Sequence, residues 1–325
     1  MPMLRRHLLV TLLATLPAAS AVQAQDAWPA KPLRLVVPFP AGGGTDIVAR
    51  PLGDALAARL KQAVVVDNKP GAATLIGADA VAKAPGDGYT LLVSGSTTFT
   101  VNPALRKKLP YDPQRDLQPV AMIARAPLAL LVRADAPWKR LDELVAAAKA
   151  RPGQISYASF GTASGPQLAA ALLGLAAGIE LLEVPYKGSA AALTDVIGGQ
   201  VQVGIDTVAA AAPQVKAGKL RALAIIGSVR SSLLPEVATV AELKLPDAVF
   251  DAWYAVALPG RTEAVLRQRI EGELKAVWAQ PALLAGLRAQ GMEPVFIGSA
   301  ALQPLIDAEA ARYRMLAHRA RIVVE

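Results

Sequence analysis

Short apolar runs that alternate with helical segments restrict the fold of this chain more than any other feature of its sequence. The run 33–37, for example, is followed by a glycine-rich loop and then by a helical pattern over 46–60. Strands that alternate with helices in this way form parallel-rich sheets with helices on both faces, so we predict an α/β fold. The predicted strands are 33–37, 64–67, 89–94, 155–159, 181–184, 201–206, 220–226, 253–258 and 293–297. The predicted helices are 46–60, 75–84, 165–177, 189–197, 263–278, 281–290 and 300–317.

The alternation is interrupted between residues 102 and 119, where four prolines argue against regular structure. Beyond the N-terminal segment the chain has about 300 residues, more than one hydrophobic core usually organises, so we predict two lobes. Because the C-terminal part has too few strands for a sheet of its own, it should return to the first lobe. The chain then crosses twice, near 120–132 and 249–258, and two crossings make a hinge. The predicted lobes are 25–125 with 251–325 (lobe 1) and 126–250 (lobe 2).

The first 24 residues have the features of a cleavable secretory signal peptide. Arg5, Arg6 and His7 form a basic start, an apolar run spans 8–16, and small residues lead to Ala24. An uncleaved membrane anchor is the competing interpretation, but the run is well short of the roughly 20 residues that span a bilayer. We therefore predict that residues 1–24 are removed on export and that the mature protein is in the periplasm.

Two scarce residue types exclude several kinds of chemistry. The chain has no cysteine, which excludes thiol nucleophiles, iron–sulfur clusters and disulfides. It has two histidines, and His7 lies in the predicted signal peptide, so only His318 remains. A single histidine argues against Ser-His-Asp catalysis and cannot form a histidine-rich metal site. We predict no metal site, and we expect His318 on the surface of the C-terminal helix.

Motifs for cofactors and nucleophiles are also missing. Gly42-x-Gly44 is followed by Ile47 where a dinucleotide site requires a third glycine, and neither GxxxxGK[ST] nor GxSxG occurs. The chain has 34 basic and 26 acidic side chains, a balance that favours anionic partners. The compact basic run 106–108 has no interleaved aromatic residues, so we expect no nucleic-acid partner. These observations favour binding over catalysis, without a cofactor.

Two loops that connect a strand to a helix are the best candidates for a ligand site. Ligands of open parallel sheets lie beyond the carboxyl ends of the strands, at helix N-termini. The loops are 38–46, with three consecutive glycines, and 158–165. Their peptide N–H groups can converge on an anion, and two such loops facing each other could hold one carboxylate. The alternative is that the first loop is only a tight connection, with Thr45 or Asp46 capping the helix.

Seven short segments, spread over the chain beyond residue 27, carry a family resemblance. They are WPAKPLR (28–34), 37–50, DNKPGA (67–72), APGDGYTLL (84–92), LPYDP (109–113), VPYKGS (184–189) and AGKLRALA (217–224). In this order they closely resemble the tripartite tricarboxylate transporter receptor family, often called Bug proteins. The resemblance runs through essentially the whole chain after the predicted signal peptide.

The resemblance implies a periplasmic solute-binding receptor with a two-lobed, type II-like periplasmic binding protein fold, and not an enzyme. In that family, a ligand carboxylate is held mainly by backbone amides and hydroxyls of the two strand-to-helix loops, partly through water. The implied partners are a small carboxylate solute and integral-membrane permease subunits, and we expect a monomer. The residues implied to bind or line the ligand site are Phe39, Ala41, Gly42, Gly43, Gly44, Thr45, Asp46, Ser94, Ser96, Thr97, Ser159, Gly161, Thr162, Ala163, Ser164 and Asp206.

Three places depart from the family pattern. Pro51 lies a turn into the first helix and removes one backbone hydrogen bond, at a cost of up to about 3 kcal/mol. A helix that began after Pro51 would weaken the anion site. The stretch 73–75 replaces a glycine- and asparagine-rich turn, and Gln167 stands where relatives often have histidine. These two changes indicate either an altered pocket or drift.

Two other functions are compatible with the same residues. A sensory adaptor would bind the same solute but dock to a membrane kinase instead of a permease. A hydrolase would need Asp46 or Asp206 as a base, and no paired carboxylates stand at a recognisable spacing. Citrate-like acids, acidic amino acids and aromatic acids all remain open as the solute.

Overall fold

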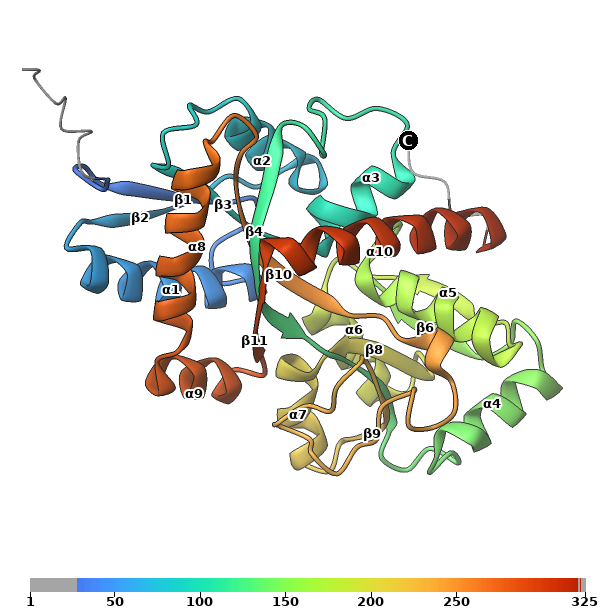
Figure 1. Ribbon diagram of the computed structural model, residues 1–325. Coiled ribbons are helices and arrows are strands. Elements are labelled where there is room, and N and C mark those ends of the chain that lie inside the picture. Colours follow the sequence, from blue (N-terminus) through green and yellow to red (C-terminus); the bar gives the residue numbers. More distant parts are fainter. Residues whose placement is uncertain (1–27, 321, 323–325) are drawn as a thin grey trace, which may run out of the picture.

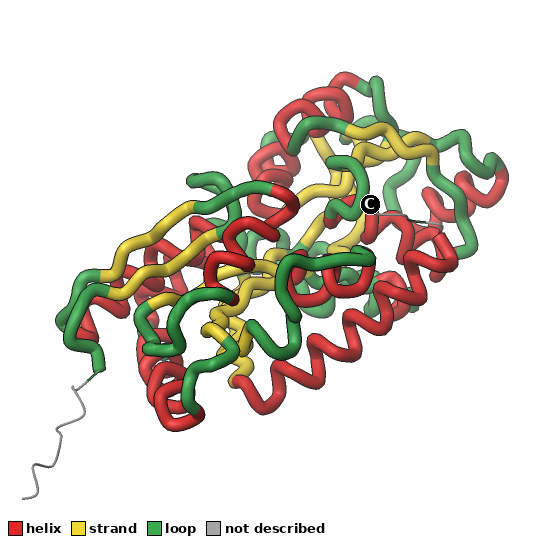
Figure 2. The backbone as a smooth tube through the Cα atoms, turned by 90° about the horizontal axis from the view of Figure 1, so that it is seen from above, coloured by secondary structure: helices red, strands yellow, loops and turns green. Residues whose placement is uncertain are grey.

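The computed structural model describes residues 28–320 and residue 322. Two sheets, each with helices packed against it, form a two-lobed α/β fold (Figure 1). Seen from above, the strands of the two sheets lie toward the two ends of an elongated molecule (Figure 2). The predicted signal peptide falls outside the described residues. Among those described, no helix is both long enough and apolar enough to cross a membrane.

The sheet of lobe 1 has six strands, and two of them come from the C-terminal part of the chain. They are β1 (Leu33–Val37), β2 (Val64–Asn68), β3 (Thr90–Gly95), β4 (Leu117–Ala126), β10 (Ala252–Pro259) and β11 (Glu293–Gly298). Their order is β11-β4-β10-β3-β1-β2, so β10 lies in the middle of the sheet. The prediction that the C-terminal part returns to the first lobe is confirmed.

The sheet of lobe 2 has five strands from one continuous stretch of chain. They are β5 (Leu128–Arg133), β6 (Ser156–Ser159), β7 (Leu182–Pro185), β8 (Val203–Thr207) and β9 (Leu220–Ile226). Their order is β7-β6-β8-β5-β9. The central strands β5 and β8 are apolar because helices cover both faces of the sheet, and Leu130 and Val203 are fully buried.

Strand pairing is mixed, which corrects the expectation of parallel-rich sheets. The pairs of β1 with β2 and β3, and of β6 with β7 and β8, are parallel. The strands at the crossings, β4, β5 and β10, pair antiparallel with their neighbours, and so does β11. Parallel neighbours need a long crossover connection, usually a helix. A strand that passes directly from one sheet into the other has no such connection.

The helices cover both sheets. They are α1 (Gly44–Leu60), α2 (Leu75–Ala82), α3 (Asn102–Leu105), α4 (Leu141–Ala150), α5 (Gly165–Ala177), α6 (Ser189–Gly198), α7 (Val208–Lys216), α8 (Ala264–Trp278), α9 (Pro281–Ala289) and α10 (Ser299–Ala320). Three short helical turns, η1 (Ala72–Thr74), η2 (Thr97–Val101) and η3 (Pro246–Ala248), complete the set. His318 lies exposed on α10, as expected.

The prediction that residues 102–119 lack regular structure was wrong at both ends. Pro103 lies in the first turn of α3, where its missing N–H removes no helical hydrogen bond. Pro119 lies in β4 next to an irregularity in the pairing with β10, where proline is tolerated. Two helices outside this stretch, α4 and α7, were also not predicted. In α7 the reason is Pro213, because proline inside a helix normally breaks it.

The chain crosses between the sheets twice, as predicted. β4 ends at Ala126 in one sheet and β5 begins at Leu128 in the other. The return lies between the end of β9 at Ile226 and the start of β10 at Ala252. The lobe boundaries after residues 125 and 250 stay predictions.

The last helix, α10, packs against both lobes. In its first half, Leu302 and Ile306 join the core of lobe 1, and in its second half Tyr313 and Leu316 join the core of lobe 2. Figure 1 shows α10 running across the molecule beside α3 and toward α5. The lobes are therefore joined by two chain crossings and by one helix.

A hydrogen-bond network on α10 lies where the lobes meet. Glu309 accepts hydrogen bonds from Trp253 Nε1 of β10 at 2.9 Å and from the Tyr313 hydroxyl at 3.1 Å. Burial raises the pKa of Glu309, and although these hydrogen bonds lower it, the pKa stays above its ordinary value. The nearby carboxylate of Asp251 adds to the increase.

This raised pKa predicts a pH-dependent stability. A carboxyl group whose pKa is raised by folding binds its proton more tightly in the folded state. The stabilisation that Glu309 contributes is fully present below its pKa in the unfolded state, about 4.3. This stabilisation is lost as the pH rises through its pKa in the folded state. We therefore expect the free energy of unfolding of the wild type to fall, relative to Glu309→Gln, as the pH rises from about 4 to 7. Urea unfolding across this range measures the difference, and a constant difference would contradict the prediction.

Candidate functional site

The predicted site residues of each lobe lie at one edge of its sheet. In lobe 1, β1 and β3 are parallel neighbours, so the loop after β1 and the turn η2 after β3 leave the sheet from the same edge. In lobe 2, β6 lies parallel to β8, so the loop after β6 and the end of β8 share an edge as well. The topology thus brings each set of predicted residues together.

Helix α1 begins without a side-chain cap. Its N-cap residue is Gly43, and the N–H groups of the first turn, on Gly44, Thr45 and Asp46, have no acceptor within the helix. Gly42 turns the backbone into this position at φ +81°, which glycine adopts without strain. Neither Thr45 nor Asp46 caps the helix, contrary to the alternative considered from the sequence. Free N–H groups and the helix dipole together attract an anion.

Asp46 holds this loop from the inside. Its Oδ2 accepts hydrogen bonds from Gly42 N at 2.8 Å and Arg50 Nε at 2.7 Å, and its Oδ1 accepts from Asn68 Nδ2 at 3.0 Å. Asn68 also donates to Phe39 O at 3.1 Å, which ties the loop to β2. Burial alone would raise the pKa of Asp46, but the hydrogen bonds and the charge of Arg50 bring it below its ordinary value. Asp46 is therefore ionised, and both of its carboxylate oxygens accept hydrogen bonds that hold the loop in place. We call a carboxylate with this role the brace of its loop.

Helix α5 in lobe 2 begins in the same way. Its N-cap residue, Ser164, makes no cap hydrogen bond to the first turn, and its Oγ instead accepts from Phe160 N at 3.3 Å. Pro166 has no N–H, and the amides of Gly165 and Gln167 have no acceptor within the helix. Lobe 2 therefore also presents free backbone donors.

Glu183 of β7 is the corresponding brace in lobe 2. Its Oε1 accepts from Ser159 Oγ at 2.6 Å, and its Oε2 accepts from Gln167 Nε2 at 3.0 Å. Gln167 Oε1 accepts from Ala163 N at 2.7 Å and so supports Ala163 at φ +60°. That conformation costs a residue other than glycine about 1–2 kcal/mol. Gln167, one of the departures from the family pattern, therefore orders the loop.

Both helix N-termini lie against the segment that returns from lobe 2 to lobe 1. A Cβ atom on Gly44 would overlap Tyr254 Oη, and one on Gly165 would lie 3.4 Å from Phe250 Cε1. The Thr45 side chain also hydrogen-bonds the Tyr254 hydroxyl. Since Phe250 and Tyr254 are four positions apart, their Cα atoms are at most about 14 Å from each other. The free donors of both lobes therefore lie beside this returning segment.

The predicted residues after β3 are mostly enclosed. Ser94 and Thr98 are fully buried, and their hydroxyl oxygens lie 2.5 Å apart. Ser96 is buried as well, and Thr97 is half-buried. In the two loops, by contrast, Ala41, Gly42 and Thr162 are exposed, and Phe39, Gly43, Gly44, Gly161, Ala163 and Ser164 are half-buried.

Asp206 is buried at the end of β8 and is 2% exposed. Its Oδ2 accepts from Ser189 Oγ at 2.5 Å, and its Oδ1 accepts from Thr207 N at 2.7 Å. Burial raises the pKa of Asp206, and these hydrogen bonds offset only part of the increase. Thr207, not Asp206, is the N-cap of α7. Asp206 thus joins the end of β8 to the first residue of α6.

The other two departures from the family pattern, at Pro51 and at residues 73–75, also have a structural explanation. Pro51 lies inside α1, which begins at Gly44, so the helix N-terminus remains at the glycine-rich loop. The segment 72–74 keeps a left-handed turn without glycine, with φ values of +47°, +51° and +80°. Asn102 Nδ2 supports this turn by donating to Ala73 O at 2.7 Å.

Three residues that organise the loops were not identified from the sequence. Asn68 directly follows a predicted strand at the same edge of the sheet, and this position was a usable signal. Glu183 is a charged residue within a short strand, which signals a partner for its carboxylate. Tyr254 carried no local signal, because its contact with α1 joins two distant parts of the sequence.

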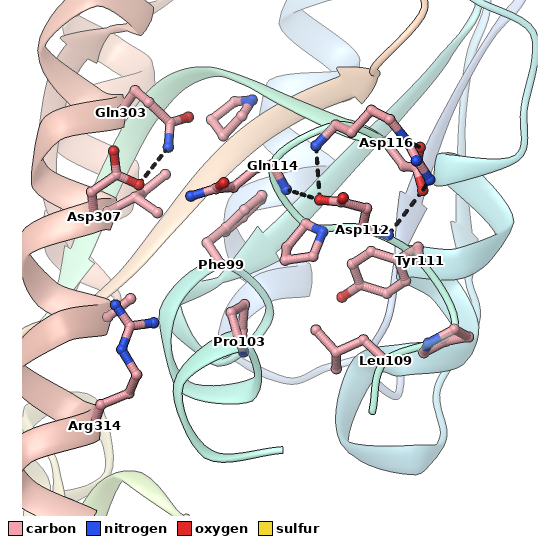
Figure 3. A pocket seen from close by; sticks show the side chains of 16 residues that line it. Phe99, Pro103, Leu109, Tyr111, Asp112, Gln114, Asp116, Gln303, Asp307 and Arg314 are labelled. Atoms are coloured by element: carbon pink, nitrogen blue, oxygen red, sulfur yellow. Dashed lines mark hydrogen bonds and ion pairs between the residues drawn. The ribbon is translucent and has the colours of Figure 1, made fainter. Parts of the chain in front are cut away.

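A hollow of about 720 Å³ on the other side of the hinge contains none of the predicted site residues. Phe99 lines it and stacks on Trp253, which points to the opposite face of β10 from Tyr254. The hollow therefore lies on the face of β10 away from α1. Figure 3 shows Tyr111, Asp112, Gln114 and Asp116 of the proline-rich loop opposite Gln303, Asp307 and Arg314 of α10. Within residues 28–320, no group of acidic and histidine side chains could hold a metal ion.

The sequence matches known proteins over most of its length. The profile of the tripartite tricarboxylate transporter family receptor matches residues 48–321. Protein BugT of Bordetella pertussis is 39% identical over 284 residues, which cover 87% of this chain and 87% of BugT.

Solved structures are similar over almost the whole chain. An R. palustris protein solved with adipate is 33% identical, with a TM-score of 0.78 over 91% of this chain and 99% of its own. MatC from Rhodopseudomonas palustris, solved with bound malate, is 29% identical, with a TM-score of 0.72 over 89% of this chain and 99% of its own.

The close approach of Tyr254 to α1 predicts that two adjacent glycines respond differently to substitution. Gly44→Ala places a methyl group against Tyr254 Oη, and overpacking of this kind costs about 1–3 kcal/mol of stability. At Gly43 the nearest atom to a new Cβ is Pro40 O at 3.5 Å, so Gly43→Ala should cost no more than the weaker N-cap, below about 1 kcal/mol. Urea unfolding of both variants measures the difference. Equal losses would show that Gly44 is not needed for this contact.

Proposed function

This chain belongs to the tripartite tricarboxylate transporter receptor family, whose members are solute-binding receptors and not enzymes, and we propose that it captures a small carboxylate-bearing solute in the periplasm. The solute binds between the two lobes. The closed receptor then delivers it to the integral-membrane subunits of a permease.

The pair of uncapped helix N-termini carries this proposal. α1 and α5 belong to different lobes, and both begin beside the hinge segment 250–254. Each offers backbone N–H donors and the positive end of a helix dipole, which is the environment that an anion prefers. A carboxylate has two oxygens, so it can engage both lobes at once and hold them closed.

The hydrogen bonds available are sufficient for a working affinity. Three or four bonds to a charged carboxylate, at about 1.5–3 kcal/mol each, give a gross sum of roughly 5 to 12 kcal/mol. The two helix dipoles add about 0.3–1 kcal/mol each. Micromolar capture requires about 8 kcal/mol, so the upper part of this range meets it after the costs of association.

The ligands of two similar receptors support the same class of solute. The R. palustris protein was solved with adipate and MatC with malate, and both ligands carry carboxylates. The two acids differ in length and in substituents. We therefore expect the loops of this chain to recognise a carboxylate end, and other residues between the lobes to select the remainder of the solute.

The two carboxylates that a hydrolase would need are already engaged. Asp46 accepts three hydrogen bonds and is kept ionised by Arg50. Asp206 accepts hydrogen bonds on both oxygens and is enclosed at the end of β8. Neither group is available to activate a water molecule, which agrees with membership in a receptor family.

A thermal-shift screen against mono-, di- and tricarboxylates and their amides tests the proposal. An acid that binds only the folded state stabilises it by about 2.7 kcal/mol at a hundred times its Kd. For a chain of this size we expect the melting temperature to rise by roughly 5 °C. The matching amide should give a much smaller shift, because it lacks the charge that the helix N-termini attract. Equal shifts for acid and amide, or no shift with any acid, would refute the ligand class.

A further inference from the structure

Tyr254 of β10 lies on the face of the hinge strand that meets α1. Its neighbour Trp253 points to the opposite face, where its ring stacks on Phe99 with 5.7 Å between the ring centroids. The Tyr254 side chain therefore projects toward the first turn of α1, as its contact with Gly44 shows.

An irregularity in the strand ladder occurs at this residue. Tyr254 pairs with Ala124 of β4, but the next residue, Ala255, pairs with Met122, so Ile123 is left without a partner in the register. A bulge of this kind increases the local twist and re-aims side chains, and bulges are frequent beside functional sites. The backbone of the hinge thus helps to set the direction of the tyrosine.

The tyrosine ring lies between two glycines. On one side a Cβ on Gly44 would overlap Oη, and on the other a Cβ on Gly95 would lie 3.5 Å from ring atoms Cδ1 and Cε1. Gly95 is also the partner of Tyr254 in the pairing of β10 with β3. Because Gly44 is the first residue of α1, the phenolic oxygen lies beside the free amides of the helix N-terminus.

The hydroxyl of Tyr254 pairs with the Thr45 side chain, and either oxygen of such a pair can donate. Burial raises the pKa of Tyr254 to about 12, so the phenol is protonated at neutral pH. The hydrogen bond with Thr45 acts in the opposite direction. Tyr254 as a whole is half-buried. When Thr45 donates to the phenolic oxygen, the phenolic proton is free for an acceptor outside the chain.

We propose that Tyr254 donates its hydroxyl proton to the carboxylate of the captured solute, beside the amides of Gly44 and Thr45. This inference rests on the proposed function and adds a neutral, directional donor to the backbone groups. Since Tyr254 belongs to the strand that joins the lobes, the solute then contacts the hinge itself as well as the two loops.

The substitution Tyr254→Phe tests this inference, because it removes the hydroxyl and keeps the ring between the glycines. Adipate and malate are the first probes, followed by every acid that stabilises the wild type in the screen. Isothermal titration calorimetry should show a dissociation constant about ten- to a hundredfold higher, the loss of one hydrogen bond to a charged group. The melting temperature without acid should remain that of the wild type.

Tyr89→Phe is the matched control. The Tyr89 hydroxyl accepts a hydrogen bond from Ala30 N at 2.8 Å, and Tyr89 precedes β3, whereas Gly95 ends it. The control thus also removes a tyrosine hydroxyl, but at the opposite end of β3 from the residue that pairs with Tyr254. The control should bind each acid as tightly as the wild type.

The outcomes separate this inference from the function on which it rests. Acid binding that is equal in the wild type and in Tyr254→Phe overturns the inference and leaves the proposed function in place. A wild type that binds no acid overturns both. If Tyr254→Phe also lowers the melting temperature, the comparison of acid with amide decides. Loss of a hydrogen-bond donor to the carboxylate should weaken binding of the acid more than binding of its amide. An equal loss of affinity for acid and amide overturns the inference.

Discussion

Free backbone donors at the starts of α1 and α5 are the constraint around which the two loops are arranged. Such donors bind an anion well only if they are already held in place, since ordering a loose loop would cost binding energy. Each lobe meets this requirement with a carboxylate beneath its loop, Asp46 in one and Glu183 in the other. Both carboxylates accept hydrogen bonds from groups that shape the loop and leave the first-turn amides free. Arg50 offsets the negative charge of Asp46, so this brace does not repel the anion that it helps to position.

The hinge strand β10 connects this arrangement with the rest of the molecule. Adjacent residues of a strand point to opposite faces, so Trp253 contacts Glu309 on α10 while Tyr254 contacts the first turn of α1. Helix α10 in turn packs against the cores of both lobes. The loops, the hinge and the helix that spans the lobes are therefore linked through two consecutive side chains. A rotation of one lobe against the other has to move these contacts together.

The sequence was sufficient for the architecture, because apolar strands and helical patterns are local signals. It placed the two loops correctly between their strands and helices, and it foresaw the return of the C-terminal part to lobe 1. Strand direction was less predictable, since β4, β5 and β10 pair antiparallel for reasons of topology and not of composition. The braces were missed for a similar reason. Asp46 was read as a ligand-lining or capping residue, and only the positions of Asn68 and Arg50 in space show that its oxygens are occupied. The assignment of the loop residues to a ligand stays a prediction.

The topology of lobe 1 has a consequence for how the protein folds. The sheet of lobe 2 is encoded in one continuous stretch, so it can be completed before the C-terminal strands are in place. In lobe 1, β10 lies between β3 and β4, although it is synthesised long after both. Until β10 arrives, β3 and β4 lack the strand that joins them, and unpaired strand edges promote aggregation. Lobe 1 therefore has a continuous sheet only when the C-terminal strands are in place, whereas lobe 2 does not depend on them.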